Sequence, residues 1–294
     1  MSELNIRENV ILKNYTTMRC GGPARYFAEP SGTDGLIEAF NFAAKNNLKV
    51  FVLGMGSNIL VSDKGFDGLV IRFGKKMGDI DIQNGRIRAK AGATLASFGN
   101  RAAAQGLAGA EFACGIPGSV GGAVFMNAGA YGRELSDICV SVTYWDGYDI
   151  KTIDKDMCDF GYRQSFFSKE DGAVVLECCC ELEPGDKTKI LEYIDELRTK
   201  RTTSQPLDVP SSGSTFKRPT GYFAGKLIED SGLRGFKLDE SGAQVSPKHC
   251  GFVVNNGGTA SASDVLRLIN YVSDKVFEDS GVRLEREVRL VGEF

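Results

Sequence analysis

The spacing of hydrophobic residues predicts alternating helices and strands in the first half of the chain. Leu36, Ile37, Phe40 and Ala44 share one face of residues 34–46, which predicts an amphipathic helix. Short apolar runs at 50–53, 69–73 and 80–82 predict strands, and the last run is followed by an Asn84-Gly85 turn. Thr94 has the position of an N-cap for a helix that ends at Gly106.

The second half begins with a strand-rich stretch over 138–182, followed by a predicted helix over about 186–202. That helix directs Ile190, Leu191, Ile194 and Leu197 inward, and its basic last turn suits the negative end of the helix dipole. Residues 205–214 are rich in Pro and Ser and predict a linker. Helices near 222–230 and 262–278 and a strand over 282–291 complete the chain. This mixture predicts an α+β protein.

Composition narrows the class of protein. The chain has 294 residues, with 42% hydrophobic and 25% charged residues, and a net charge of −3 without a basic stripe, which argues against a nucleic-acid partner. No apolar run reaches the roughly 18 residues that a membrane span needs, and the N-terminus lacks a signal-peptide pattern. Eight cysteines without a CxxC pair predict reduced thiols in the cytoplasm.

A single histidine, His249, restricts the chemistry further. It rules out a multi-histidine metal site, so we expect no metal, and a structural role for His249. A proton donor is therefore expected among Ser, Cys, Tyr, Lys or carboxyl groups.

Two glycine-rich loops indicate a ligand. LGMGSN at 53–58 follows a predicted strand, where a glycine turn brings backbone N–H groups close to a phosphate or simply makes a tight turn. It is neither a Rossmann fingerprint nor a P-loop. The second loop is longer, GIPGSVGG at 115–122 followed by MNAGAYG at 126–132. Two such loops suggest a long diphosphate ligand, and FAD has the required reach.

Eight motifs in register resemble one family. They are TTMRCGGPARYF, LGMGSNILVSDKGFDGLVI, GIPGSVGGAVFMNAGAYG, FGYRQSFF, GSTFKRP, AGKLIEDSGLRG, AQVSPKHCGFVVN and LEREVRLVG. Together they run from residue 16 to 292 and resemble the UDP-N-acetylenolpyruvoylglucosamine reductases.

The resemblance implies an FAD-binding fold of the vanillyl-alcohol-oxidase type with a separate C-terminal α+β substrate domain. The implied division places one FAD-binding subdomain at 1–73, completed by 283–294, and a second at 74–204. A substrate-binding domain follows at 205–282. The short interval between the YR-x-S and GS-x-FK motifs implies the subtype without a substrate-capping tyrosine loop. A residue after Tyr131 or a group near Gln205 is then expected to cover the substrate.

The resemblance also implies a reaction. NADPH reduces non-covalently bound FAD, which passes a hydride to the enol ether of UDP-N-acetylglucosamine enolpyruvate. The product, UDP-N-acetylmuramate, serves peptidoglycan synthesis and hence cell wall biogenesis, cell shape, the cell cycle and cell division. The implied partners are therefore the UDP-sugar and NADPH, with no nucleic acid, membrane or obligate protein partner.

Three residues acquire catalytic roles through the resemblance: Arg163, Ser214 and Glu287. Arg163 would stabilise charge on the substrate carboxylate, Ser214 would donate the proton, and Glu287 would orient or protonate the carboxylate. Without the family pattern, Arg163 would be a surface or structural arginine and Ser214 a linker serine. Glu287 would then lie on a solvated edge with Arg283, Glu285 and Arg289.

The same resemblance assigns the binding residues. For the cofactor they are Gly54, Met55, Gly56, Ser57, Asn58, Ile59, Leu60, Ala113, Gly115, Ile116, Pro117, Gly118, Ser119, Gly121, Gly122, Ala123, Ala128 and Gly129. For the substrate they are Tyr162, Gln205, Lys217, Arg218, Gln244 and Asn255. Arg218 stands where the family commonly has asparagine, so it would contact the diphosphate more strongly. Lys217 would ease proton transfer from Ser214.

Two other functions compete with this interpretation. An oxygen-using oxidase of the same flavin fold would lack the GS-x-FK and EVR motifs. It would often carry a histidine near the N-terminal glycine loops, where this chain has none. A non-catalytic flavin or nucleotide sensor would carry a partner-binding element, and the sequence shows none.

Overall fold

The computed structural model describes residues 4–170 and 172–294, which form two compact units. The first unit contains Ala28–Met55, Ile71–Arg201 and the described part of Met1–Ile6. The second contains Arg7–Phe27, Gly56–Val70 and Thr202–Phe294. The N-terminal and C-terminal segments therefore share one unit, and the predicted division into three domains stays a prediction.

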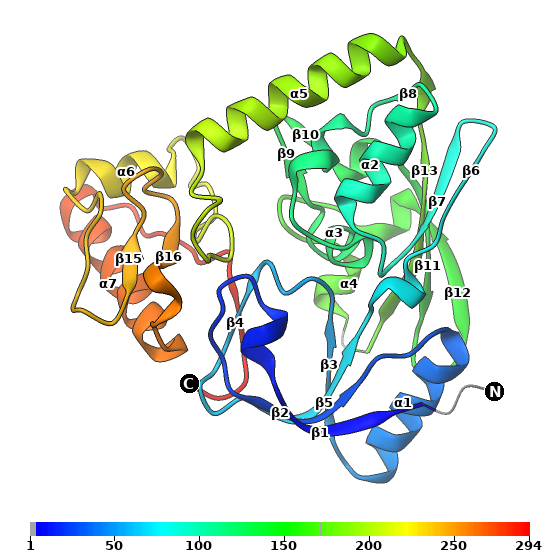
Figure 1. Cartoon of the computed structure of the whole chain (residues 1–294), viewed down its shortest axis with the longest axis horizontal. Helices are drawn as coiled ribbons and strands as arrows, with labels where there is room; N and C mark the ends of the chain where they lie inside the picture. Colours follow the sequence, from blue (N-terminus) through cyan, green and yellow to red (C-terminus); the bar gives the residue numbers. More distant parts are fainter. Residues whose placement is uncertain (1–3, 171) are drawn as a thin grey trace. The chain divides into compact units, whose positions relative to one another are not determined.

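A five-stranded antiparallel sheet organises the first unit, in the order β12-β11-β13-β7-β6 (Figure 1). The central strand β13, VVLECCCE, is buried on both faces except at the half-buried Glu177 and the exposed Glu181, because small apolar side chains fit either side. Cys178 of β13 pairs with Val142 on one side and Ala89 on the other. The strands are β6 (Ile80–Gln83), β7 (Arg86–Lys90), β11 (Cys139–Trp145), β12 (Ile150–Asp154) and β13 (Val174–Glu181).

Helices complete the first unit; α1, α2 and α5 form where the sequence predicts them, whereas α3 and α4 were not predicted. α2 begins as expected, since the Thr94 side chain accepts a hydrogen bond from the Ser97 N–H at 3.0 Å. α5 differs from the prediction at one residue: Ile190, Ile194 and Leu197 are buried, but Leu191 is 44% exposed. Residues four and seven positions apart make a narrow stripe, which leaves Leu191 outside the packed face. The helices are α1 (Thr33–Lys45), α2 (Leu95–Ala104), α3 (Val120–Met126), α4 (Phe166–Lys169) and α5 (Lys187–Ser204).

Short elements fill the rest of this unit. β9 pairs with β10 and β14 with β8, both antiparallel. The bounds are β3 (Lys49–Leu53), β8 (Leu107–Ala108), β9 (Gly129–Ala130), β10 (Arg133–Glu134), β14 (Glu183–Pro184), η2 (Lys75–Met77), η3 (Glu111–Gly115), η4 (Leu135–Asp137) and η5 (Lys155–Cys158).

The second unit is built around one core beneath helix α7. Leu268, Val272 and Val276 of α7 are fully buried in a cluster that also includes Met18 and Leu60 from the N-terminal half. A reciprocal capping box of Ser261 and Asp264 starts this helix. The elements that lie wholly or mostly in this unit are β1 (Ile6–Ile11), η1 (Leu12–Tyr15), β2 (Pro23–Ala28), β4 (Ile59–Val61), β5 (Phe66–Arg72), α6 (Ala224–Asp230), β15 (Ala243–Val245), β16 (Val253–Asn255), η6 (Asn256–Gly258), α7 (Ala262–Ser280) and β17 (Arg289–Val291).

The final predicted strand is shorter than expected. Only Arg289–Val291 forms a strand, β17, which pairs in parallel with β4. The residues before it instead follow the segment after the linker: the Lys217 N–H donates to the Glu285 carbonyl, and Phe216 bridges Arg286. The alternation of apolar and polar residues predicted one long strand. Instead, two different segments of the chain pair with its two parts.

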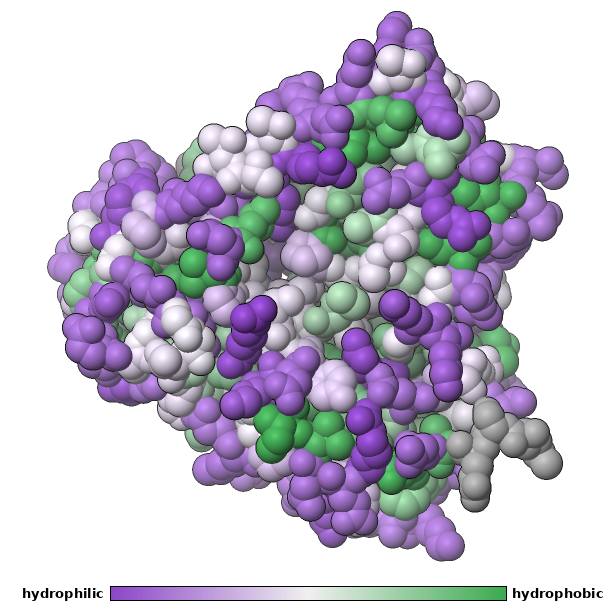
Figure 2. All heavy atoms as spheres, viewed as in Figure 1, coloured by the Kyte–Doolittle hydropathy of each residue, from purple (hydrophilic) through white to green (hydrophobic). Residues whose placement is uncertain are grey.

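The surface in view is mostly polar. Figure 2 shows hydrophilic side chains over most of this face, with hydrophobic residues in small separate groups. None of the helices in residues 4–170 and 172–294 has the length and hydrophobicity needed to cross a membrane.

Candidate active site

The two glycine loops meet inside the first unit. A Cβ added to Gly54 would lie 2.3 Å from the Ser119 Oγ, so only glycine allows this approach. Ser119 is also the N-cap of α3, where its Oγ accepts a hydrogen bond from the Gly122 N–H at 3.2 Å. Gly121 packs as tightly, since its Cβ would lie 2.8 Å from the Ala91 Cβ. Close contacts within the protein therefore already favour glycine at these two positions.

The chemistry of the loops suits a diphosphate. Residues 54–60 and 113–123 contain no Asp or Glu, so no carboxylate would repel an anion there. Gly115 lies beside the Arg201 side chain, whose Cδ would be 3.3 Å from an added Cβ. Glycine backbone, the Ser119 hydroxyl and a nearby guanidinium are groups that could hold the FAD diphosphate.

The rest of the first loop belongs to the second unit and is joined to the C-terminal segment. Gly56 has φ of +63°, and its carbonyl accepts a hydrogen bond from the Thr17 N–H at 3.1 Å. Asn58 Nδ2 donates to the Glu287 carbonyl at 3.3 Å, and the backbone carbonyl of Asn58 accepts from the Arg289 N–H at 3.1 Å. Residues 229 positions apart are thereby brought together.

Ser214 is an exposed residue between two anchored neighbours. Thr215 is buried: its N–H donates to the Gly251 carbonyl at 2.8 Å, and its Oγ1 accepts from the Val253 N–H at 2.9 Å. On the other side, Ser212 Oγ donates to the Ile59 carbonyl at 2.8 Å. The segment around Ser214 is therefore held in place, unlike a free linker.

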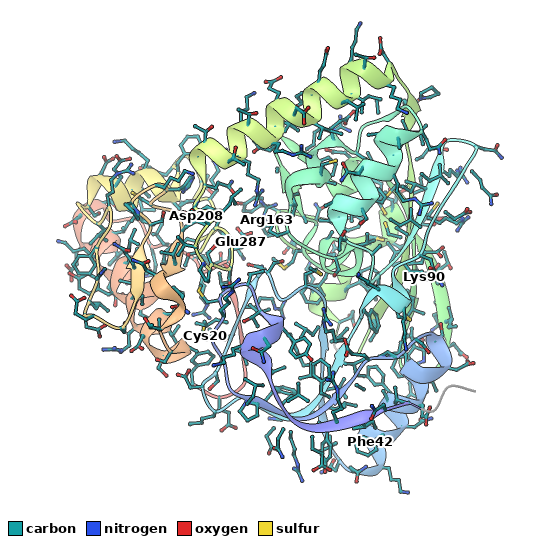
Figure 3. The ribbon with its side chains drawn as sticks, in the orientation of Figure 1. Cys20, Phe42, Lys90, Arg163, Asp208 and Glu287 are labelled. Atoms are coloured by element: carbon teal, nitrogen blue, oxygen red, sulfur yellow. The ribbon has the colours of Figure 1, made fainter. Side chains whose placement is uncertain are left out.

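Glu287 lies on the chain segment that pairs with Thr215. Its N–H donates to the Thr215 carbonyl at 2.9 Å, so Glu287 and Ser214 come from neighbouring segments of the second unit. Glu287 is half-buried, whereas Glu285 and Arg289 are exposed. The face shared by these residues is thus not uniformly solvated. Figure 3 shows Glu287 on this C-terminal segment.

Arg163, also labelled in Figure 3, occupies a tight turn of the first unit. Gly161 and Gln164 exchange backbone hydrogen bonds of 3.1 and 3.3 Å, and Arg163 between them has φ of +57°, which is uncommon for a residue with a side chain. Its Nη2 donates to the Gly129 carbonyl at 3.2 Å, and its guanidinium lies 5.0 Å from the Tyr162 ring centre. Arg163 is thereby placed beside the second glycine loop.

Comparisons with known proteins agree with this arrangement. Residues 24–149 match a family model described as an FAD binding domain, and residues 205–291 match the C-terminal domain of UDP-N-acetylenolpyruvoylglucosamine reductase. The proteins of that name from Agathobacter rectalis and Lactiplantibacillus plantarum are 48% and 45% identical to this chain. The alignments cover 100% and 99% of the chain, and 96% and 95% of those relatives.

The chain belongs to the UDP-N-acetylenolpyruvoylglucosamine reductase family. A crystal structure of the reductase from Thermus caldophilus superposes with a TM-score of 0.85 at 34% identity, covering 98% of this chain and 100% of that one. The predicted α+β fold with an FAD-binding domain is confirmed.

Three of the substrate-binding residues expected in this family member have accessible or unsatisfied groups, and a fourth, Lys217, is already ion-paired. Tyr162 is 49% exposed, and the Arg218 guanidinium lies 4.0 Å from the Phe223 ring centre on an exposed segment. Gln205 has a buried Oε1 without a hydrogen-bond donor among the described residues. Lys217 forms an ion pair with Glu285, so part of the charge expected to assist Ser214 is already neutralised.

The other two expected substrate residues have structural partners. Asn255 is fully buried: its Nδ2 donates to the Met18 carbonyl at 3.0 Å, and its Oδ1 accepts from the Ala260 N–H at 2.8 Å. Gln244 Nε2 donates to the Gly235 carbonyl at 3.0 Å. In this conformation the Asn255 side chain has no surface to offer a substrate, so we leave it out of the proposed contacts.

Arg201 is a candidate that the sequence reasoning missed. Its half-buried guanidinium has no carboxylate partner in the described part of the chain, and burial lowers the pKa of this arginine. The signal in the sequence is the basic last turn of the predicted helix 186–202, which suits the helix dipole and also contains Arg201. A desolvated cation beside Gly115 indicates an anionic ligand more directly.

His249 and the cysteines have no evident chemical role. His249 Nδ1 accepts a hydrogen bond from the Gly251 N–H at 3.1 Å, consistent with the expected structural role. All eight cysteines are free thiols. Among the described residues no group of His, Cys, Asp and Glu side chains could hold a metal ion.

We predict that the cysteines do not take part in turnover. Burial raises the pKa of Cys20 to about 12 and that of Cys114 to about 11, so at neutral pH both remain thiols rather than nucleophilic thiolates. Cys114→Ala should retain FAD and turn over within about twofold of the parent. A thiol reagent should react faster as the pH rises toward 11. Loss of turnover in Cys114→Ala with FAD still bound would contradict the prediction.

Proposed function

We propose that this protein reduces UDP-N-acetylglucosamine enolpyruvate to UDP-N-acetylmuramate, with NADPH as the donor and FAD as a non-covalent cofactor, for peptidoglycan synthesis. The relatives' names support this substrate. The observation that carries the proposal is the link between Asn58 of the first glycine loop and the segments of Glu287 and Ser214. These hydrogen bonds join the segments of the two expected proton donors, Ser214 and Glu287, to the loop expected to bind the flavin.

Each proposed residue role follows from its chemistry. When bound, FAD would supply the hydride chemistry that connects NADPH to the enol ether double bond. Arg163 carries a fixed positive charge that would stabilise negative charge developing at the substrate carboxylate. Ser214 presents an exposed hydroxyl on an anchored segment and would give a proton to the adjacent carbon. Glu287 would orient or protonate that carboxylate.

The UDP-sugar contacts are proposed for residues with unsatisfied or exposed polar groups. The buried Gln205 Oε1 needs a donor, and an N–H of the substrate would supply it. The exposed guanidinium of Arg218 offers a pair of donors that matches a diphosphate oxygen pair. Arg201 beside Gly115 is proposed to contact the diphosphate of the cofactor.

We further propose that the protein acts in the cytoplasm without an obligate protein partner. Its substrates are small charged molecules, and its eight thiols are free, as expected in a reducing compartment. Acid precipitation should release the flavin into the supernatant, because the loops contain no histidine, and burial raises the pKa of their cysteine, Cys114, so that it stays a thiol.

Anaerobic titration tests the function. The purified protein should be yellow, should bleach on addition of NADPH, and should regain its colour only when the enolpyruvyl substrate is added. UDP-N-acetylglucosamine without the enolpyruvyl group is the control and should leave the protein bleached. Recolouring by oxygen alone, with no response to the enolpyruvyl substrate, would favour an oxidase. Failure of NADPH to bleach the flavin would favour a sensor.

A further inference from the structure

Asn127 has an unusual position within the second glycine loop, at the end of α3. It follows the last residue of α3 in the left-handed conformation, with φ of 42° and ψ of 59°, and its side chain is fully buried. Asparagine tolerates this conformation better than most residues with a side chain. Glycine would adopt it more easily, so an amide at this position suggests that its polar atoms are needed.

Both polar atoms of the Asn127 side-chain amide form hydrogen bonds. Its Nδ2 donates to the Gly161 carbonyl at 3.1 Å, and its Oδ1 accepts from the Ser136 N–H at 3.0 Å. Gly161 is the first residue of the turn that carries Arg163. One side chain therefore connects the end of α3, the turn at η4 and the Arg163 turn.

A second tie holds the other side of the same turn. Ser165 is fully buried, and its Oγ donates to the Phe125 carbonyl at 2.9 Å. Arg163 is thus flanked by Gly161 and Ser165, and each is hydrogen-bonded to a residue at the end of α3. The positive φ of Arg163 is unfavourable by itself and persists only if surrounding contacts enforce it.

We propose that Asn127 is a positioning residue for the reductase reaction, acting through Arg163. Its amide fixes the turn in the strained conformation that directs the guanidinium toward the Gly129 carbonyl and keeps it ready for the substrate carboxylate. This inference rests on the role proposed for Arg163. In this proposal Asn127 itself contacts neither substrate nor cofactor.

Asn127→Gly tests it, because glycine retains the left-handed backbone and removes both side-chain hydrogen bonds. Loss of a buried hydrogen bond with one partner left unsatisfied should slow reduction of the enolpyruvyl substrate by about 10- to 100-fold. Flavin reduction by NADPH should stay within about twofold of the parent. Asn84→Gly is the matched control, since Asn84 is exposed and also has positive φ, 51°. It should leave both half-reactions unchanged.

A double variant separates positioning from a general structural effect. In an Arg163→Ala background, Asn127→Gly should slow the substrate step by less than about twofold more, because the residue it positions is gone. Ser165→Ala, which removes the other tie, should show the same selective loss, and it serves as the test if Asn127→Gly does not fold.

Three results would overturn the inference. The first is an equal loss in both half-reactions, and the second is a full additional loss in the Arg163→Ala background. The third is a parent-like substrate step in both Asn127→Gly and Ser165→Ala. If Arg163→Ala alone reacts at the parent rate, the proposed role of Arg163 fails and this inference fails with it. If only the Asn127 and Ser165 variants behave like the parent, the proposed function stands without this inference.

Discussion

Replacing Ser214 by alanine should leave FAD binding and flavin reduction by NADPH nearly intact, while slowing reduction of the enolpyruvyl substrate by about 10² to 10⁴. Hydride transfer needs the flavin and a polarised acceptor, whereas completing the reduction needs a proton on the other carbon. The Ser214 segment is held by Thr215 and Ser212 on either side, so a missing hydroxyl should not move the backbone.

Anaerobic stopped-flow spectroscopy measures this effect directly. The enzyme is first reduced with NADPH and then mixed with substrate, and flavin reoxidation is followed. Ser214→Cys should restore part of the rate, because a thiol also donates a proton. Ser211→Ala is the control, since the contact of Ser211 with Thr17 uses its backbone carbonyl and is retained. Reoxidation of Ser214→Ala at the parent rate would mean that the proton comes from Glu287 or water.

Arg163→Ala should weaken substrate binding and also slow the substrate's reduction. A guanidinium that contacts the carboxylate before and during hydride transfer affects the ground state and the transition state alike. Removing a charged hydrogen-bonding partner of this kind should reduce kcat/KM by at least about 10²-fold. Flavin reduction by NADPH should remain near the parent rate, which distinguishes this variant from one that damages the flavin loops.

Steady-state and single-turnover kinetics together separate the two effects. KM for the enolpyruvyl substrate should rise and the reoxidation rate should fall. Arg163→Lys should recover only part of both, because an ammonium lacks the planar pair of donors. Arg86→Ala removes an exposed arginine that pairs with Glu181 on the surface, and it should change neither value. An unchanged KM and reoxidation rate in Arg163→Ala would show that Arg163 serves only to hydrogen-bond the Gly129 carbonyl.

The sequence by itself determined the elements whose signals are local. The helix from Leu95 to Ala104 follows from the Thr94 cap, and the α7 helix follows from its regular apolar stripe. Both depend on residues three or four positions apart, so no distant contact is needed to predict them. The eight ordered motifs also determined the family, because their spacing is itself a property of the sequence.

Only the tertiary structure decided which residues are neighbours. Asn58 and Glu287 lie 229 positions apart, and the hydrogen bond between them cannot be read from either motif alone. The expected strand 282–291 is divided because its last three residues pair with β4, whereas residues 285–288 bond to the Thr215 segment. Leu191 remains exposed because packing covers a narrower stripe of α5 than its hydrophobicity would allow.

The same limit explains the residues that the sequence analysis passed over. In the sequence alone, Asn127 is one polar residue in a glycine loop, and Arg201 is a charged residue at the end of a predicted helix. Their significance comes from burial and from contacts with Gly161 and Gly115, which distant segments bring to them. Periodicity reports which face of an element is apolar. The tertiary fold determines which partner a buried polar group contacts. The roles proposed for Asn127 and Arg201 rest on those contacts.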